Sequence, residues 1–253
     1  MKKRFAAFVS TVLAAVLCAC SAAPKDVLPN KAAQPTEAPT QQAQTTQAAP
    51  TEQPTPEPDL VQQLLEEMTL EQKVGQLFLV RPDSLDLSQT QDQINDAKAD
   101  GVTELTDAMR QTLAEYPVGG VVIFGKNLES PQQITQFLDD LQQASDTPLF
   151  TAIDEEGGLV ARLANNAAFD LPQYESAAAV GTSGNPEDAR AMGRTIGGYL
   201  KEYGFNLDFA PVADVNTNPD NPVIGTRAFS SDPQTAADLV GGACAGFADA
   251  GIA

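Results

Sequence analysis

The feature that most constrains the fold of this chain is a repeated alternation of short apolar runs with segments of helical periodicity. The apolar runs span residues 77–81, 119–127, 148–154 and 205–215. Strands that are apolar throughout and alternate with helices are typical of a parallel sheet covered on both faces. No G-x-G-x-x-G loop follows any of these runs, which disfavours a dinucleotide-binding sheet. We therefore predict an α/β fold, a (β/α)8 TIM-type barrel of which about the first four βα units are present in this chain.

Capping residues predict where several helices begin. Three dipeptides place a capping side chain directly before proline, the arrangement expected at the first positions of a helix. These dipeptides are Ser130-Pro131, Asn185-Pro186 and Asp232-Pro233. Thr69 and Gln72 fit a capping box, which predicts that a second short helix restarts after an interruption near residue 69.

The N-terminus has the pattern of an export signal. Residues 1–20 combine a basic start, an apolar stretch and the junction "LCAC". The junction resembles a bacterial lipobox, in which Cys20 becomes the lipidated first residue of the mature protein. An ordinary signal peptide and an uncleaved anchor are the alternatives. We predict a lipoprotein that is extracytoplasmic and anchored to the bacterial cell membrane through Cys20.

A polar segment separates the signal from the globular part. Residues 21–58 are rich in Pro, Thr, Gln and Ala and contain no aromatic residue, so they bury too little apolar surface to fold. We predict a disordered linker there and a folded domain over residues 59–253. The net charge is −19, which disfavours nucleic acid as a partner. Cys244, among small residues at helical spacing, is expected to be buried and structural.

Polar residues gather where the predicted strands end, above all at Asp154, Glu155 and Glu156. Side chains alternate along a strand, so Asp154 and Glu156 share one side while Glu155 faces away. Two carboxylates alone are a weak metal signal, and we predict no metal site. The arginines nearest in these loops, Arg162 and Arg227, offer forked donors for a carboxylate or a hydroxylated ligand. The chain has no histidine, which excludes Ser-His-Asp and Cys-His catalysis within it.

Five collinear motifs resemble one known family. "MTLEQKVGQLF", "GGVVIFGKN", "AIDEEGGLVARL", "GFNLDFAPVADVNTNPDNPVIGTRAFSSDP" and "AGIA" are similar to the N-terminal half of the glycoside hydrolase family 3 barrel, in its β-N-acetylhexosaminidase branch. The resemblance implies that Asp154, Arg162 and Arg227 bind the sugar. Asp214 is expected to support the rim that the carboxyl ends of the strands form. Glu155 stands where glutamine is usual, and we expect it to add charge beside the pocket.

The resemblance also implies a function. Complete members are retaining glycosidases that need no cofactor, and their acid/base and nucleophile follow a "K-H-F-P-G-H-G" loop that this chain lacks. We expect an exported enzyme that removes β-linked N-acetylglucosamine from cell-wall or related glycans, here truncated before its catalytic residues and inactive by itself. The alternatives are a non-catalytic sugar-binding surface lipoprotein and an inactive fragment. A β-glucosidase is the nearest enzymatic rival.

Overall fold

The computed structural model describes residues 60–253 of the chain. The predicted signal peptide, the predicted lipidation site at Cys20 and the predicted linker lie outside the described residues. Within residues 60–253, no helix is both long enough and apolar enough to cross a membrane.

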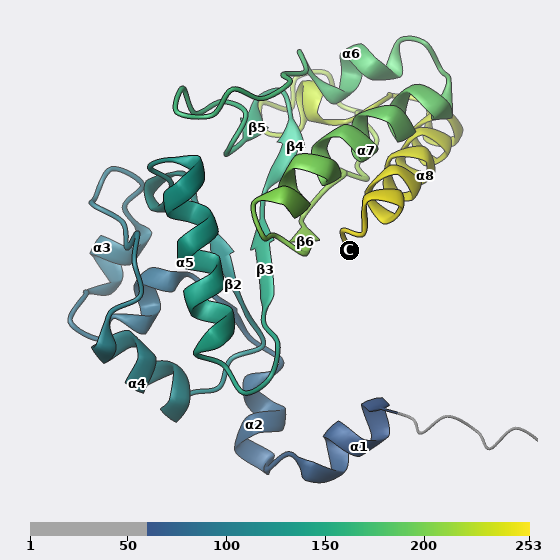
Figure 1. Ribbon diagram of the computed structural model, residues 1–253. Coiled ribbons are helices and arrows are strands. Elements are labelled where there is room, and N and C mark those ends of the chain that lie inside the picture. The colour runs from purple at the N-terminus through teal and green to yellow at the C-terminus, as the bar shows by residue number, and fades with distance from the viewer. Residues whose placement is uncertain (1–59) are drawn as a thin grey trace, which may run out of the picture. The chain divides into compact units, whose positions relative to one another are not determined.

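Four parallel strands form the sheet, in an order that follows the chain (Figure 1). The strands are β1 (Leu79–Val80), β2 (Gly120–Ile123), β3 (Phe150–Ile153) and β6 (Leu207–Asp208). Each strand pairs in parallel with the next, in the order β1-β2-β3-β6. The predicted α/β class and parallel pairing are confirmed, and the barrel stays a prediction.

The register of the sheet brings the carboxyl ends of three strands together. Ile123 of β2 lies opposite Ile153 of β3, which lies opposite Asp208 of β6. The next residues along the chain, Phe124 and Asp154, therefore leave the sheet side by side at one rim. In parallel α/β folds this end of the sheet is where ligands bind.

Helices lie between successive strands of the sheet along the chain. They are α1 (Leu60–Glu67), α2 (Leu70–Gly75), α3 (Gln91–Asn95), α4 (Asp107–Glu115), α5 (Pro131–Gln143), α6 (Ala177–Gly181), α7 (Pro186–Glu202) and α8 (Pro233–Ala250), with short 3-10 turns η1 (Pro82–Leu85), η2 (Gly125–Asn127) and η3 (Gly225–Arg227). The Ser130, Asn185 and Asp232 side chains each accept a backbone N–H in the first turn of their helix. Thr69 and Gln72 form the predicted capping box. The predicted helix starts are thus confirmed.

The core lies between one face of the sheet and the helices. Val121 and Ile123 of β2 and Ile153 of β3 are fully buried, in one cluster with Phe137 and Leu141 of α5. Figure 1 shows α5 running along β2 and β3 on that side. On the opposite face Phe150 is 49% exposed, so the described residues cover the two faces unequally.

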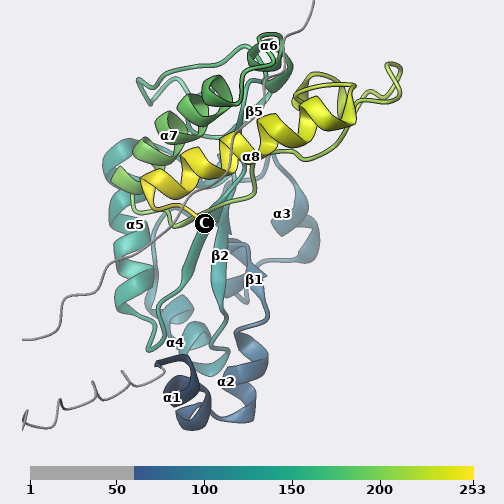
Figure 2. The same ribbon diagram turned by 90° about the vertical axis from the view of Figure 1, so that its right-hand side faces the viewer.

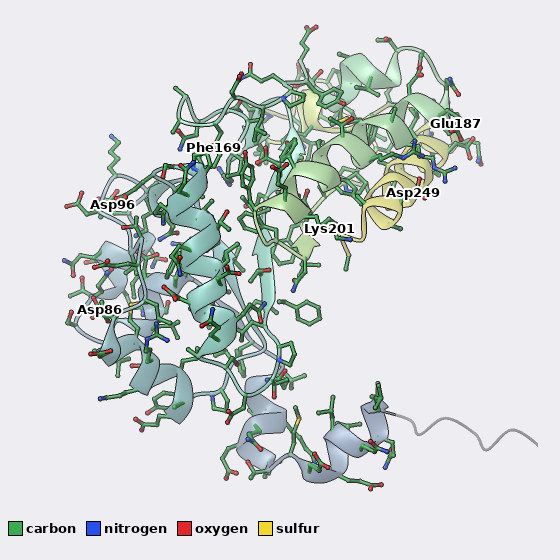
Figure 3. All side chains as sticks on the ribbon, viewed as in Figure 1. Asp86, Asp96, Phe169, Glu187, Lys201 and Asp249 are labelled. Atoms are coloured by element: carbon green, nitrogen blue, oxygen red, sulfur yellow. The ribbon has the colours of Figure 1, made fainter. Side chains whose placement is uncertain are left out.

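Helices α7 and α8 pack in parallel, side by side in both views (Figures 1 and 2). Gly242 and Gly246 of α8 lie against the carbonyl oxygens of Pro186 and Arg190 of α7, where a Cβ atom would come within 2.2 and 2.1 Å. Figure 3 labels Asp249 on α8. Its carboxylate accepts a hydrogen bond from Arg190 Nε of α7 at 2.8 Å.

The exposure of Cys244 differs from the prediction. Cys244 is free and exposed, because α8 turns Ala243 and Phe247 into the core and leaves Cys244 on its outer side. The expectation of a buried structural cysteine is therefore wrong.

The chain returns to the sheet after α8. The Ala253 N–H donates to the Asn206 carbonyl at 3.0 Å, and the Asp208 N–H donates to the Ala253 carbonyl at 2.9 Å. This is the bonding pattern of a parallel neighbour, so Ala253 lies beside β6 on the side away from β3.

Some observed elements were not predicted. The strands are shorter than the apolar runs; for the run 205–215, pairing with β3 stops near Phe209, two residues before Pro211, which has no N–H to donate. A small antiparallel hairpin of β4 (Glu155–Gly157) and β5 (Val160–Ala161) follows β3. Helices α3 and α6, of five residues each, are also new.

Candidate functional site

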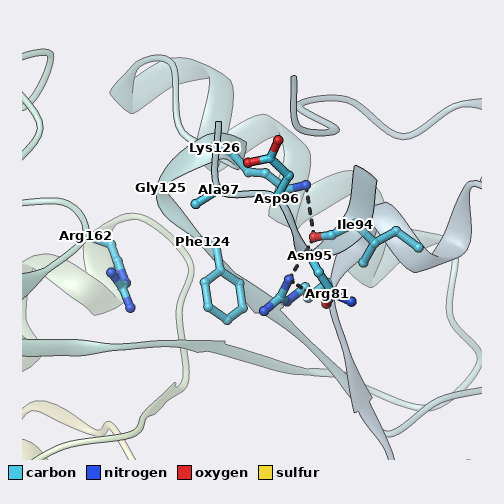
Figure 4. Close-up of a pocket in the computed structure, with 9 residues that line it drawn as sticks. All are labelled: Arg81, Ile94, Asn95, Asp96, Ala97, Phe124, Gly125, Lys126 and Arg162. Carbon is cyan, nitrogen blue, oxygen red and sulfur yellow. Dashed lines mark hydrogen bonds between the residues drawn. The ribbon is translucent and has the colours of Figure 1, made fainter. Parts of the chain in front are cut away.

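A pocket of about 370 Å³ opens at the carboxyl ends of β1 and β2 (Figure 4). Arg81 follows β1 and Phe124 follows β2, so two strand ends supply its walls. The lining residues are Arg81, Ile94, Asn95, Asp96, Ala97, Phe124, Gly125, Lys126 and Arg162. The pocket therefore combines one aromatic ring with three basic side chains.

The Phe124 ring lies between two guanidinium groups, as Figure 4 shows. The Cζ atom of Arg81 is 4.4 Å from the ring centroid, and that of Arg162 is 5.7 Å away. Arginine over an aromatic face is a favourable cation–π contact. Arg81 also donates to the Ile94 carbonyl at 2.7 Å, which fixes its direction along the pocket wall.

Asp154 and Arg162, predicted from sequence as sugar-binding residues, form an ion pair. The Arg162 NH2 group donates to Asp154 Oδ2 at 3.0 Å, and the two side chains are 34% and 26% exposed. The hairpin makes this contact possible, because Gly157 and Gly158 adopt φ values of +83° and +68° at its turn. The Arg162 Nε atom is buried without a hydrogen-bond partner, so this side chain retains donors.

Arg227, the third predicted sugar-binding residue, pairs with Glu156 instead of Asp154. Its Nε and NH2 groups donate to both Glu156 oxygens at 2.8 and 2.7 Å, in a bidentate geometry. A third bond runs from NH1 to the Val223 carbonyl at 3.1 Å. The hydrogen bonds to Glu156 raise the pKa of Arg227. The structure therefore assigns one arginine to each of the two acids that flank Glu155 in the "DEEGG" segment.

Glu155 lies inside the protein and does not add charge beside the pocket, so that expectation is wrong. The side chain is fully buried and accepts the backbone N–H groups of Leu163 and Ala164 at 2.8 and 2.9 Å. The Tyr199 hydroxyl of α7 donates to it at 2.8 Å. Burial raises the pKa of Glu155, while the two N–H groups lower it. Glu155 differs from its neighbours as the sequence argument expects, because backbone amides and Tyr199 hold it, whereas arginines hold Asp154 and Glu156.

A second buried network stands behind the pocket. The Lys126 ammonium lies 3.2 Å from Asp83, with side chains 5% and 0% exposed. Asn127 donates to the same carboxylate at 3.0 Å. These groups hold the loop after β2 against the turn after β1.

The sequence identified part of this site and missed the rest. It singled out Asp154, Arg162 and Arg227, and the structure brings the first two into contact. Glu156 was grouped with its neighbouring acids but not matched to Arg227, because the two lie 71 residues apart. Phe124 carried no signal beyond its place inside the apolar run 119–127.

Two further points concern the rim. Asp214, expected to support the rim, is exposed and acts on Arg227 only as a nearby charge. Among residues 60–253, no group of three or more acids or cysteines is placed to hold a metal ion. The rim therefore offers forked donors, carboxylate acceptors and an aromatic ring, a set suited to a ligand with several hydroxyl groups.

Comparison with known proteins gives a consistent set of relatives. The model of the glycosyl hydrolase family 3 N terminal domain matches residues 69–253. Beta-hexosaminidase A of Pseudoalteromonas piscicida is 36% identical over 143 residues, which are 54% of this chain and 24% of that protein. Beta-hexosaminidase LpqI of Mycobacterium tuberculosis is 34% identical over 156 residues, or 60% of this chain and 38% of that protein.

A solved structure agrees with these relatives. The glycoside hydrolase family 3 beta-N-acetylglucosaminidase from Paenibacillus sp. str. FPU-7 superposes with a TM-score of 0.62 and 35% identity, covering 74% of this chain and 32% of that one. The chain thus spans less than half the length of each of these three relatives.

Proposed function

Because the chain belongs to glycosyl hydrolase family 3, we propose that residues 59–253 form the N-terminal part of the catalytic barrel of a β-N-acetylhexosaminidase. The strand order supports a barrel, since each strand lies beside the next one in the chain. The return of Ala253 to the free side of β6 continues the same progression. The two relatives described above are β-hexosaminidases, which supports the activity.

The ion pair of Asp154 and Arg162 is the observation that carries the proposal. It lies at the carboxyl ends of the strands, and Arg162 also lines the pocket together with Phe124. In this proposal Asp154 accepts hydrogen bonds from sugar hydroxyls, and Arg162 and Arg227 donate to them. Both arginines keep a forked donor fixed in direction, so little rotational freedom is lost when a sugar binds.

The substrate in this proposal is β-linked N-acetylglucosamine in cell-wall or related glycans, removed by a retaining mechanism. The acid/base and the nucleophile lie outside residues 59–253. The geometry supports this division, because Asp154 and Glu156 are each held by an arginine and Glu155 is bonded inside the protein. The same observation favours sugar binding without hydrolysis as the second candidate function for this chain alone.

We also propose that the protein is exported and anchored to the membrane through Cys20. The basic start, the apolar stretch and the "LCAC" junction support this placement. The composition of residues 21–58 supports a tether between the anchor and the sugar-binding domain.

Titration of the full chain with N-acetylglucosamine tests the proposal, with glucose as the comparison for a β-glucosidase. We expect tighter binding of N-acetylglucosamine. Asp154→Ala and Arg227→Ala should each weaken it roughly ten- to a hundred-fold, the effect of losing a hydrogen bond to a charged group. Asp238→Ala, an exposed acid on α8, is the matched control. Equal binding of both sugars, or an unchanged affinity in Asp154→Ala, would contradict the proposal.

A further inference from the structure

Two carboxyl groups are buried directly behind the rim. Glu155 of β4 is fully buried, and Asp208 at the end of β6 is 5% exposed. They are joined through the backbone, because the Glu155 N–H donates to Asp208 Oδ1 at 2.9 Å. Burying a carboxylate is costly unless hydrogen bonds compensate it, so the bonds of each group matter.

The two acids are compensated unequally. Glu155 accepts three hydrogen bonds, from the N–H groups of Leu163 and Ala164 and from the Tyr199 hydroxyl. Asp208 accepts one, and its Oδ2 atom is buried without any partner. Three donors suit an ionised carboxylate, whereas an unpartnered oxygen suits a neutral carboxyl group. The geometry therefore places the negative charge on Glu155 and the proton on Asp208.

These bonds fix both ends of the ion pair at the rim. Asp154 precedes Glu155, whose N–H is held by Asp208. Arg162 precedes Leu163, whose N–H is held by the Glu155 carboxylate. Glu155 thus links the backbones of both partners. Asp154 is its neighbour in the chain, and Leu163, the residue after Arg162, donates to its carboxylate.

We propose that Glu155 and Asp208 are positioning residues for Asp154 and Arg162, and that ionisation of Asp208 weakens sugar binding at the rim. The inference rests on the proposed function for its ligand, and on the buried contacts for its mechanism. A second negative charge beside Glu155 would repel it and loosen the bonds that hold both segments. Asp154 and Arg162 would then be out of position for hydrogen bonds to the sugar.

The surrounding charges agree with this inference. Burial, together with the charges of Glu155, Asp154 and Glu156, raises the pKa of Asp208 to about 8, against the lowering effect of the hydrogen bond from the Glu155 N–H. Asp208 is therefore neutral in the folded protein below this pH. The stability associated with the neutral form is fully present below the unfolded pKa of 3.8, falls as the pH rises, and is gone above about 8.

The other charged and titratable groups that face the pair come from α7 and from the rim. On α7, burial raises the pKa of Tyr199 above its usual range, and Glu155, Asp208 and Tyr174 raise it further. Arg162 and Arg227 neutralise the two outer acids. Since the chain has no histidine, no imidazole contributes in this range. Any thiol or amino group that titrates in this pH range would change the affinity of the wild type and of a variant without the Asp208 carboxyl to the same extent.

The test follows the affinity of the full chain for N-acetylglucosamine from about pH 6 to about pH 10. In the wild type we expect the dissociation constant to rise at least about tenfold, the loss of one hydrogen bond to a charged group, with its midpoint near pH 8. Asp208→Asn keeps the oxygen that accepts the Glu155 N–H and cannot ionise, so its affinity should stay level. Glu155→Gln removes the neighbouring charge and should move the midpoint to lower pH.

A structural role alone would lower stability without moving that midpoint, so circular dichroism at each pH separates the two. A wild-type affinity that is independent of pH would overturn the proposal, and so would an unchanged profile in Asp208→Asn.

If no binding is seen at any pH, the proposed function fails, and the positioning is judged on the carbon-detected Arg162 guanidinium signals. A titration near pH 8 that is absent from Asp208→Asn supports it; identical signals in both proteins overturn it.

Discussion

The ion pair of Glu156 and Arg227 is expected to couple the hairpin to the loop after β6 with a measurable free energy. Two bonds of 2.7 and 2.8 Å join the groups, whose side chains are 7% and 23% exposed. Exposed ion pairs contribute about 0 to 1 kcal/mol. Breaking a buried pair costs about 3 to 5 kcal/mol. Since Arg227 keeps part of its surface in water, we expect a coupling of roughly 1 to 2 kcal/mol.

A double-mutant cycle measures this coupling. Glu156→Gln, Arg227→Met and the double variant are unfolded in urea, and the free energies of unfolding are compared. Each single substitution should lower the free energy of unfolding, and the double variant should lose less than their sum. The more exposed pair of Arg190 and Asp249, with side chains 36% and 32% exposed, serves as the control and should couple more weakly.

The outcome also depends on salt. A pair this buried should keep most of its coupling at high ionic strength, whereas the control pair should lose its coupling. A coupling below about 0.5 kcal/mol, within the usual error of additivity, would refute the reasoning. It would mean that the bidentate contact does not join the two segments.

Three further predictions concern other parts of the chain. Cys20→Ser should release the protein from membrane fractions, and a variant that stays fully membrane-bound would exclude the lipid anchor. The chain as given should hydrolyse no aryl β-N-acetylglucosaminide above background, because arginines hold Asp154 and Glu156; turnover that Asp154→Asn abolishes would contradict this. Gly158→Ala should lower the free energy of unfolding by more than Gly184→Ala does. For Gly184→Ala we expect a loss of about 1 to 2 kcal/mol, because alanine must adopt a positive φ there. Both glycines have positive φ, but only at Gly158 would a Cβ atom meet backbone atoms, at 2.8 Å, and equal urea midpoints would refute this.

Local signals predicted the fold well where they act over a few residues. The capping residues before Pro131, Pro186 and Pro233 begin their helices as predicted, because an N-cap bond needs only the next turn of the chain. The apolar runs gave a parallel sheet for a similar reason, since strands buried by helices need apolar side chains on both faces. Strand lengths were overestimated, because pairing depends on the neighbouring strand as well as on the run itself.

Distant contacts decided what the sequence could not predict. The three acids of "DEEGG" differ in role because Arg162, Arg227 and Tyr199 reach them across the fold, from 8 to 71 residues away. Alternation along the strand separated Glu155 from its neighbours, but it could not show that backbone N–H groups receive it inside the protein. The prediction for Cys244 was wrong because its neighbours in α8, "GGACAG", are all small. Their periodicity alone did not show which side of the helix is buried.

The bonds of Glu155 also join the rim to α7. The carboxylate receives the amides of Leu163 and Ala164 on one side and the Tyr199 hydroxyl of α7 on the other. Loops usually exchange their amide hydrogens through small local openings, faster than the helices they adjoin. Here the amides of Leu163 and Ala164 are bonded to a buried carboxylate that the Tyr199 hydroxyl of α7 also holds. In hydrogen–deuterium exchange these two loop amides should therefore be protected to the same degree as the middle of α7.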